Sequence, residues 1–133
     1  MEKVAHFEIP AKNKKQSQEF YEAMFGWKLQ DVPMSMGGAT ATYTTATTTE
    51  TDPQTMTPTE PGGINGAIID ESSEIKAPVI TINVDSIDDH LEKVEEKGGK
   101  VIEEKQAVEG MGFYAYVEDP SGNVIGLWED AKK

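Results

Sequence analysis

The chain has 133 residues, the size of one domain, and its 24 acidic and 12 basic residues give a net charge of −12. This charge predicts that neither nucleic acid nor an anionic membrane surface is a partner. All the basic residues are lysines and there is no cysteine, which excludes bidentate arginine clamps for anions, disulfides and thiolate chemistry. With no apolar run of membrane-spanning length and no signal-peptide pattern, we expect a cytoplasmic protein.

The first half of the chain predicts one strand, one helix and three more strands. The expected elements are a strand over 4–10, a helix over 14–25, a strand over 27–32, a turn over 34–38, and strands over 40–49 and 64–70. In the helix, Phe20, Tyr21, Met24 and Phe25 fall on one side, and Gly26 is a suitable stop. This half constitutes a first module of about residues 1–70.

Threonine occupies more than half of the positions from 39 to 59. Because threonine is β-branched, an exposed strand is expected over 40–49, followed by a mobile, proline-containing loop over 50–63. The threonine-rich segment has two interpretations, a solvated surface or a lid over a pocket.

The second half repeats the same order of elements after a linker of about residues 71–78. The expected elements are a strand over 79–84, a helix over 86–97 capped by Asp85 and Ser86, and strands over 101–108, 113–118 and 124–129. With one residue of slip between the halves, His6 corresponds to Val79 and Glu8 to Thr81. A duplicated unit of this kind predicts two modules, the second about residues 79–130, within one domain spanning 1–133.

The last two strands predict a β-hairpin with a defined register. The turn Asp119-Pro-Ser-Gly-Asn123 supplies residues for a tight turn. If Glu118 pairs with Val124, Tyr116 lies opposite Gly126 and Tyr114 opposite Trp128. The other face then carries the apolar side chains that pack against the helix, namely Phe113, Ala115, Val117, Ile125 and Leu127.

The chain resembles the vicinal oxygen chelate superfamily, which includes glyoxalase I, bleomycin-resistance proteins, extradiol dioxygenases and methylmalonyl-CoA epimerase. The segments that carry the resemblance are residues 6–10, 19–27, 95–100 and 119–128. The resemblance implies an α+β fold of two βαβββ modules, which form a curved, cup-shaped mixed sheet with the helices outside. It also implies a homodimer in which modules from different chains complete each cup.

Enzymes of that superfamily hold a divalent metal in the cup through His, Gln or Glu residues. Carried over to this chain, the ligand positions fall on His6, Val79, Gly126 and, by the expected register, Gly66. A catalytic metal site needs about three protein ligands and an open position. His6, even when joined by Glu8, does not complete such a set, so no metal site and no cofactor are expected, with a divalent metal as the alternative.

The cup is instead expected to be lined by aromatic side chains with a few polar groups. The candidate ligand-binding residues are His6, Glu8, Thr81, Tyr114, Tyr116, Gly126 and Trp128. His6 and Glu8 are also the candidates for a catalytic role, and Gly126 is expected to open volume beside Tyr116. We favour metal-free binding of a small apolar or aromatic molecule. The alternatives are a lyase, isomerase or dioxygenase with an atypical ligand set around His6, and a structural or regulatory module with a filled cup.

Overall fold

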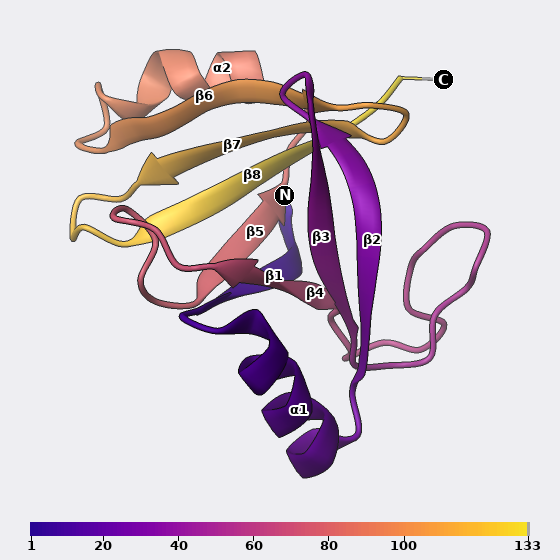
Figure 1. Cartoon of the computed structure of the whole chain (residues 1–133). Helices are drawn as coiled ribbons and strands as arrows, with labels where there is room; N and C mark the ends of the chain where they lie inside the picture. The colour runs from indigo at the N-terminus through magenta and orange to yellow at the C-terminus, as the bar shows by residue number, and fades with distance from the viewer. Residues whose placement is uncertain (133) are drawn as a thin grey trace. The chain divides into compact units, whose positions relative to one another are not determined.

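The computed structural model describes residues 1–132 and has an α+β fold. The elements are β1 (Lys3–Ala11), α1 (Lys14–Phe25), β2 (Lys28–Met36), β3 (Ala39–Thr47), β4 (Gly66–Asp70), β5 (Val79–Asn83), α2 (Ile87–Val94), β6 (Lys100–Val108), β7 (Gly112–Glu118) and β8 (Val124–Asp130). The predicted βαβββ order therefore occurs twice (Figure 1). Neither helix of the described chain is long and apolar enough to cross a membrane.

Backbone contacts divide the described residues into two compact units. The N-terminal unit consists of His6–Pro33 and Thr42–Pro78. The C-terminal unit consists of Met1–Ala5, Met34–Ala41 and the described residues from Val79 onward. The first strand and the β2–β3 hairpin thus contribute residues to both units.

In the N-terminal unit, β4 pairs in parallel with β1 and antiparallel with β3. Helix α1 covers the range predicted from the sequence. Asn13 caps its start, because the Asn13 side chain accepts a hydrogen bond from the Gln16 backbone N–H. Gly26 caps its end, with a φ of 71° and its backbone N–H donated to the Glu22 carbonyl.

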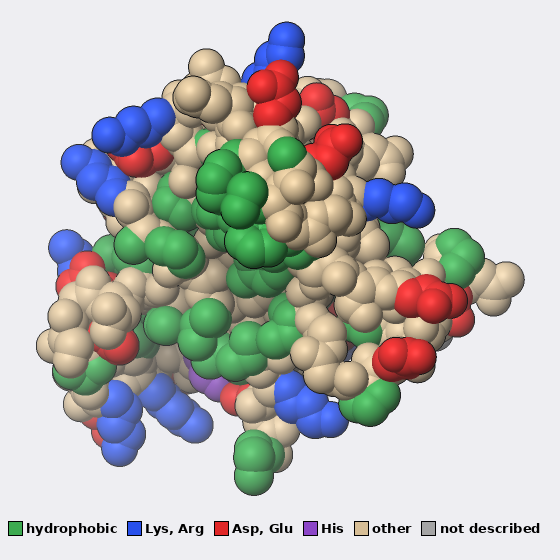
Figure 2. All heavy atoms as spheres, turned by 90° about the horizontal axis from the view of Figure 1, so that it is seen from below, with side chains coloured by type: hydrophobic (Ala, Val, Ile, Leu, Met, Phe, Trp, Pro, Cys, Tyr) green, Lys and Arg blue, Asp and Glu red, His purple; other side chains and the backbone are tan. Residues whose placement is uncertain are grey.

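The apolar side of α1 is largely exposed. Phe20, Met24 and Phe25 are 53%, 61% and 59% exposed, and α1 has no buried residue. Tyr21 is better covered because its ring stacks on the Trp27 ring, with 5.0 Å between the centroids. Figure 2 shows one face of the molecule with several hydrophobic side chains at its surface. The apolar side predicted for this helix is therefore an exposed apolar surface.

The prediction that the threonine-rich strand is exposed is wrong for part of β3. Thr44 and Ala46 are buried because they pair with Ile68 and Gly66 of β4. The Thr44 hydroxyl donates to the Asp31 carboxylate at 2.7 Å, so this buried polar group is satisfied. The following loop is tied at its base by Asn65, whose side-chain oxygen accepts from the Thr48 backbone N–H.

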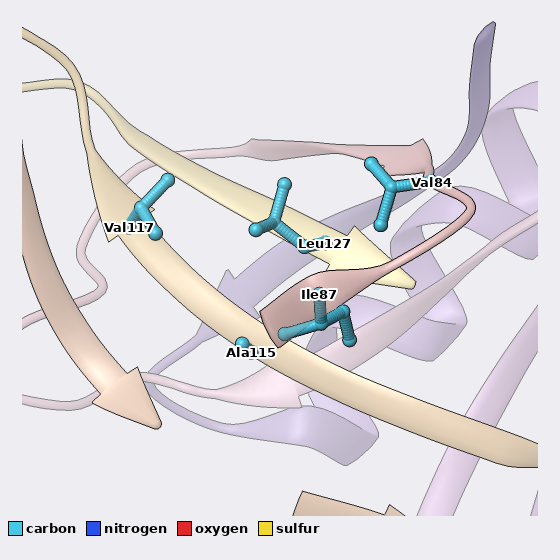
Figure 3. Close-up of a cluster of buried hydrophobic side chains, with 5 residues drawn as sticks. All are labelled: Val84, Ile87, Ala115, Val117 and Leu127. Carbon is cyan, nitrogen blue, oxygen red and sulfur yellow. The ribbon is translucent and has the colours of Figure 1, made fainter. Parts of the chain in front are cut away.

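In the C-terminal unit, β5 pairs in parallel with β8, β8 pairs antiparallel with β7, and β7 pairs antiparallel with β6. Helix α2 packs against β6, β7 and β8 (Figure 1). The buried cluster between them consists of Val84, Ile87, Ala115, Val117 and Leu127 (Figure 3). Phe113 and Ile125 pack against this cluster, which confirms the predicted apolar face of the hairpin.

Helix α2 is shorter than the predicted span of 86–97. Its first turn is capped as expected, because the Ser86 side chain accepts a hydrogen bond from the Asp89 backbone N–H at 3.2 Å. It ends at Val94, whose carbonyl accepts the Gly99 backbone N–H at 2.8 Å. The chain continues as a turn over 95–98, where the Lys97 backbone N–H donates to the Lys93 carbonyl, and Gly98 and Gly99 close this turn.

The predicted turn over 34–38 is wrong for its first three residues. Met36 pairs with Val108, and the Glu109 backbone N–H donates to the Ser35 carbonyl. These bonds extend β2 to Met36 and confine the turn to Gly37 and Gly38, where φ is 60° and 84°. Glycine adopts these positive φ angles without the steric cost of a side chain.

Candidate functional site

The predicted ligand-binding residues divide between the two units, and their grouping into one site stays a prediction. His6 and Glu8 lie in the N-terminal unit. The five others, Thr81, Tyr114, Tyr116, Gly126 and Trp128, lie in the C-terminal unit. Each group contains direct contacts of its own.

In the N-terminal unit, a tyrosine hydroxyl joins His6 to Glu8. The Tyr43 hydroxyl donates to Glu8 Oε2 at 2.9 Å and lies 3.0 Å from His6 Nε2. His6 and Glu8 point to the same face of β1 because they are two residues apart, whereas Phe7 packs on the Trp27 ring. We call these three residues the His6–Tyr43–Glu8 cluster.

The environment of this cluster keeps the imidazole neutral. Burial lowers the pKa of His6 from its ordinary value of 6.5 to about 4, because the charged form loses hydration. Glu8 is buried, and its Oε2 atom accepts a hydrogen bond from the Tyr43 hydroxyl. His6 is therefore a neutral hydrogen-bonding group near pH 7.

Sequence reasoning missed Tyr43. It lies in the threonine-rich strand, 35 residues from Glu8 and 37 from His6 in the chain. The one available signal was that Tyr43 is the only aromatic residue among the threonines and alanines of β3.

In the C-terminal unit, the predicted register of the last hairpin is confirmed. Glu118 pairs with Val124, Tyr116 with Gly126, and Tyr114 with Trp128. The Tyr114 and Tyr116 rings meet edge to face with 5.8 Å between their centroids. The indole N–H of Trp128 donates to the Asp130 carboxylate at 2.9 Å. We call Tyr114, Tyr116 and Trp128 the aromatic face.

Gly126 does not open volume on that face. Thr81 pairs with Gly126, and a Cβ atom at position 126 would lie 2.6 Å from the Thr81 hydroxyl oxygen and 3.3 Å from its Cβ. Real Cβ atoms do not approach other atoms to 2.6 Å. The expectation of empty space beside this glycine is wrong, because Thr81 occupies it.

Enzymes of the vicinal oxygen chelate superfamily carry metal ligands at positions that do not form a ligand set in this chain. Val79 is buried and apolar, and Gly126 has no donor atom. Glu8 corresponds to Thr81 of the second module. Thr81 pairs with Gly126, and Glu8 pairs with Ala67. The residue of the first module that corresponds to Gly126 is therefore Ala67, and the predicted Gly66 is wrong. Within residues 1–132, no group of three or more His, Cys, Asp and Glu side chains is arranged to hold a metal ion. The side chains present do not fit a catalytic divalent metal.

The sequence pattern of the Glyoxalase/Bleomycin resistance protein/Dioxygenase superfamily matches residues 3–127. The chain belongs to this superfamily. It is 29% identical over 115 residues to the proteins provisionally named glyoxylase CFP32 in Mycobacterium bovis and Mycobacterium tuberculosis. The match covers 85% of this chain and 40% of each relative, so the chain spans less than half the length of these curated relatives.

Solved structures share the fold of this chain at low sequence identity. A hypothetical protein from Bacillus halodurans matches with a TM-score of 0.61 and 17% identity, over 99% of this chain and 96% of that one. Methylmalonyl-CoA epimerase from Mycobacterium tuberculosis matches with a TM-score of 0.58 and 14% identity, over 96% of this chain and 87% of that one. These likenesses support the fold alone.

A separate cavity of about 410 Å³ lies in the C-terminal unit and contains none of the predicted site residues. Its lining includes Val94, Val117 and Leu127, together with the pair formed by His90 and Glu2. His90 Nε2 lies 2.8 Å from Glu2 Oε1, and His90 Nδ1 lies 2.7 Å from the Ser86 carbonyl. Both ring nitrogens face acceptors, so both bonds form only when the imidazole is protonated.

We expect the contribution of His90 to stability to fall as pH rises. Burial alone would lower its pKa, but the Ser86 carbonyl and the Glu2 carboxylate outweigh burial and raise the pKa above 6.5. Because the pKa of His90 is higher in the folded state, the protonated imidazole stabilises the fold. This stabilisation is fully present below pH 6.5 and is lost as pH rises through the pKa of His90 in the folded state. The free energy of unfolding, measured in urea, should therefore differ more between wild type and His90→Gln at pH 5.5 than at pH 8.5. A gap that does not change with pH would contradict this assignment.

Proposed function

We propose that the protein binds a small aromatic or apolar molecule without a metal ion. The observation that carries the proposal is the hairpin ladder. It places the aromatic face on the side of β7 and β8 opposite the buried cluster around Leu127. Tyrosine and tryptophan give large contact areas for planar molecules and keep a polar atom at the edge.

The donor set supports the metal-free part of the proposal. Among the described residues, the ligand-type side chains of the first strand are His6 and Glu8, and both already bind Tyr43. A single imidazole with one carboxylate holds a divalent ion weakly in comparison with a set of three ligands.

An acid–base enzyme without a metal is a second candidate, because the His6–Tyr43–Glu8 cluster contains connected titratable groups. The epimerase and the provisionally named glyoxylases show that the superfamily includes proteins named as enzymes. A third candidate, a module with no ligand, gains support from Thr81, which fills the space beside Gly126.

The proposal predicts ligand-induced stabilisation of metal-free protein. Protein purified without added metal should contain no stoichiometric zinc, nickel, manganese or iron by elemental analysis. Small planar aromatics should raise its melting temperature, since a ligand that binds only the folded state stabilises it by mass action. Trp128→Leu and Tyr116→Ala should reduce this rise.

The chain supplies matched controls. Trp27→Leu and Tyr21→Ala are the same two kinds of substitution made in the N-terminal unit, where the Tyr21 ring of α1 stacks on the Trp27 ring. They should leave the ligand-induced rise in place. One equivalent of bound metal, or no rise with any aromatic compound, would contradict the proposal.

We also propose the homodimer that the resemblance implies. The exposed apolar side of α1, formed by Phe20, Met24 and Phe25, supports it as a surface that association would bury. Light scattering of the same metal-free preparation at micromolar concentration should give twice the chain mass, and a monomer would count against the dimer.

A further inference from the structure

The cavity that His90 and Glu2 line has an apolar floor. Val117 of β7 and Leu127 of β8 are buried side chains of neighbouring strands (Figure 3), and both line the cavity together with Val94 of α2. All the residues that line the cavity belong to the C-terminal unit. Its volume of about 410 Å³ lies within the range of small-molecule sites, roughly 300–1,000 Å³.

The charged side chains around this floor are ordered along α2. Asp85 and Asp89 lie at the start of the helix, whereas Lys93 lies in its last turn and Lys97 in the turn that follows. Lys97 comes eight residues after Asp89, which corresponds to about 12 Å along a helix axis. This order of charges also complements the helix dipole, so it does not indicate a ligand by itself. It indicates one here because the two ends flank an apolar floor.

The charges at the two ends have no partner within the described chain. Glu2 is occupied, because its Oε2 atom accepts the Asp85 backbone N–H at 3.1 Å and its Oε1 atom lies 2.8 Å from His90 Nε2. Within residues 1–132, the carboxylates of Asp85 and Asp89 and the ammonium groups of Lys93 and Lys97 form no hydrogen bond or ion pair. All four residues are exposed, so these charges can meet a ligand from solvent.

We propose that this cavity binds a small zwitterion with an apolar body. Its ammonium group lies at Asp85 and Asp89, and its carboxylate lies at Lys93 and Lys97. An ω-amino acid with a chain of methylene groups is the simplest molecule of this class, because the apolar floor removes the methylene groups from water and each charged end meets the opposite charge.

This site does not depend on the proposed function. Leu127 lines the cavity, and Trp128 of the aromatic face is the next residue along β8. Successive side chains of a strand point to opposite faces of the sheet. The cavity and the aromatic face therefore lie on opposite sides of β8, and each can be tested in a variant that alters only the other.

Nuclear magnetic resonance titration of protein labelled with ¹⁵N in histidine shows where the molecule binds. The chain has two histidines, so the His90→Gln variant assigns the signals of His90 and His6. At constant pH and ionic strength, 8-aminooctanoate should shift the signals of His90, which lines the cavity, and leave those of His6 in the N-terminal unit unchanged. Trp128→Leu should give the same result. No shift of His90, or loss of the shift in Trp128→Leu, would overturn the proposal.

Matched compounds test the two charged ends. Wild type should bind 8-aminooctanoate about two- to five-fold more tightly than octanoate or octylamine, the effect of one solvent-exposed ion pair. The shorter 5-aminopentanoate should bind more weakly because it does not span both ends and covers less of the floor. Octanoate or octylamine binding as tightly as 8-aminooctanoate would overturn the zwitterion preference.

Variants assign each end to its residues. The double substitution Lys93→Gln, Lys97→Gln should bring the ratio of 8-aminooctanoate to octylamine affinity toward one. The double substitution Asp85→Asn, Asp89→Asn should do the same for the ratio to octanoate.

Two controls lie outside the cavity. Asp88→Asn removes a carboxylate from the same first turn of α2, and Lys100→Gln removes an ammonium group beyond the helix. Both should keep the wild-type ratios. Ratios that change as much in the controls as in the double variants would show a general effect of net charge and overturn the proposal.

Discussion

Gly126→Trp is expected to lower the free energy of unfolding by about 1–3 kcal/mol, the usual cost of overpacking a close-packed site. Gly126 is buried, and a Cβ atom there would lie 2.6 Å from the Thr81 hydroxyl oxygen. Thr81 is itself buried and belongs to the neighbouring parallel strand, so it has little freedom to move. Urea unfolding at constant pH measures the change.

A double-mutant cycle shows whether Thr81 is the cause. Thr81→Ala removes the hydroxyl and methyl groups that a side chain at position 126 would meet, so Gly126→Trp should cost less in that background. Val124→Trp places the same ring two residues away on the same strand face and should cost little, because Val124 is only half-buried. If Gly126→Trp unfolds no more easily than wild type, then the space beside Gly126 is empty. Val79→His with Gly126→Glu would then be the variant in which to look for a metal.

The last hairpin was predictable from the sequence because its turn is built from local interactions. Asp119 Oδ1 accepts the backbone N–H groups of Ser121 and Asn123, and Gly122 has a φ of 87°. Such a turn fixes the register of the strands on either side, and alternation of side chains then decides the two faces. The aromatic face and the apolar face of the C-terminal unit both follow from this turn.

The His6–Tyr43–Glu8 cluster was not predictable in the same way. The threonines of β3 favour a strand, but their alternation with alanine and tyrosine breaks at Thr44-Thr45, so the pattern does not indicate that Thr44 is buried. The burial of Thr44 depends on pairing with β4 and on Asp31, both distant in the chain. Tyr43 reaches the first strand through the same long-range pairing.

The metal positions illustrate how sensitive such predictions are to register. The expected register placed Gly66 where the ladder places Ala67 beside Glu8. A slip of one residue moves a side chain to the opposite face of a strand, and a side chain at Gly66 would overlap the Phe7 ring. The conclusion about ligands survives, because neither alanine nor glycine has a donor atom in its side chain.

Glu129→Leu should lower the free energy of unfolding by about 1–3 kcal/mol, the cost of leaving a buried hydrogen-bond donor without a partner. Glu129 is buried at the end of β8, and its Oε1 atom accepts the buried backbone N–H of Ile87 at 2.8 Å. Ile87 begins α2 and is fully buried in the core cluster, so the carboxylate ties the start of the helix to the sheet.

Two variants at the same place separate the hydrogen bond from the charge. Glu129→Gln keeps an acceptor oxygen and should lose less stability than Glu129→Leu. Lys105→Gln removes the ammonium group that lies 3.7 Å from Glu129 Oε2 and 3.1 Å from Asp88 Oδ2. It should lower the free energy of unfolding less than Glu129→Leu does. This loss should decrease as salt is added, because the lysine is solvent-accessible. Urea unfolding of the three variants gives the comparison. Equal losses for Glu129→Gln and Glu129→Leu would show that the charge, and not the bond to Ile87, stabilises the start of α2.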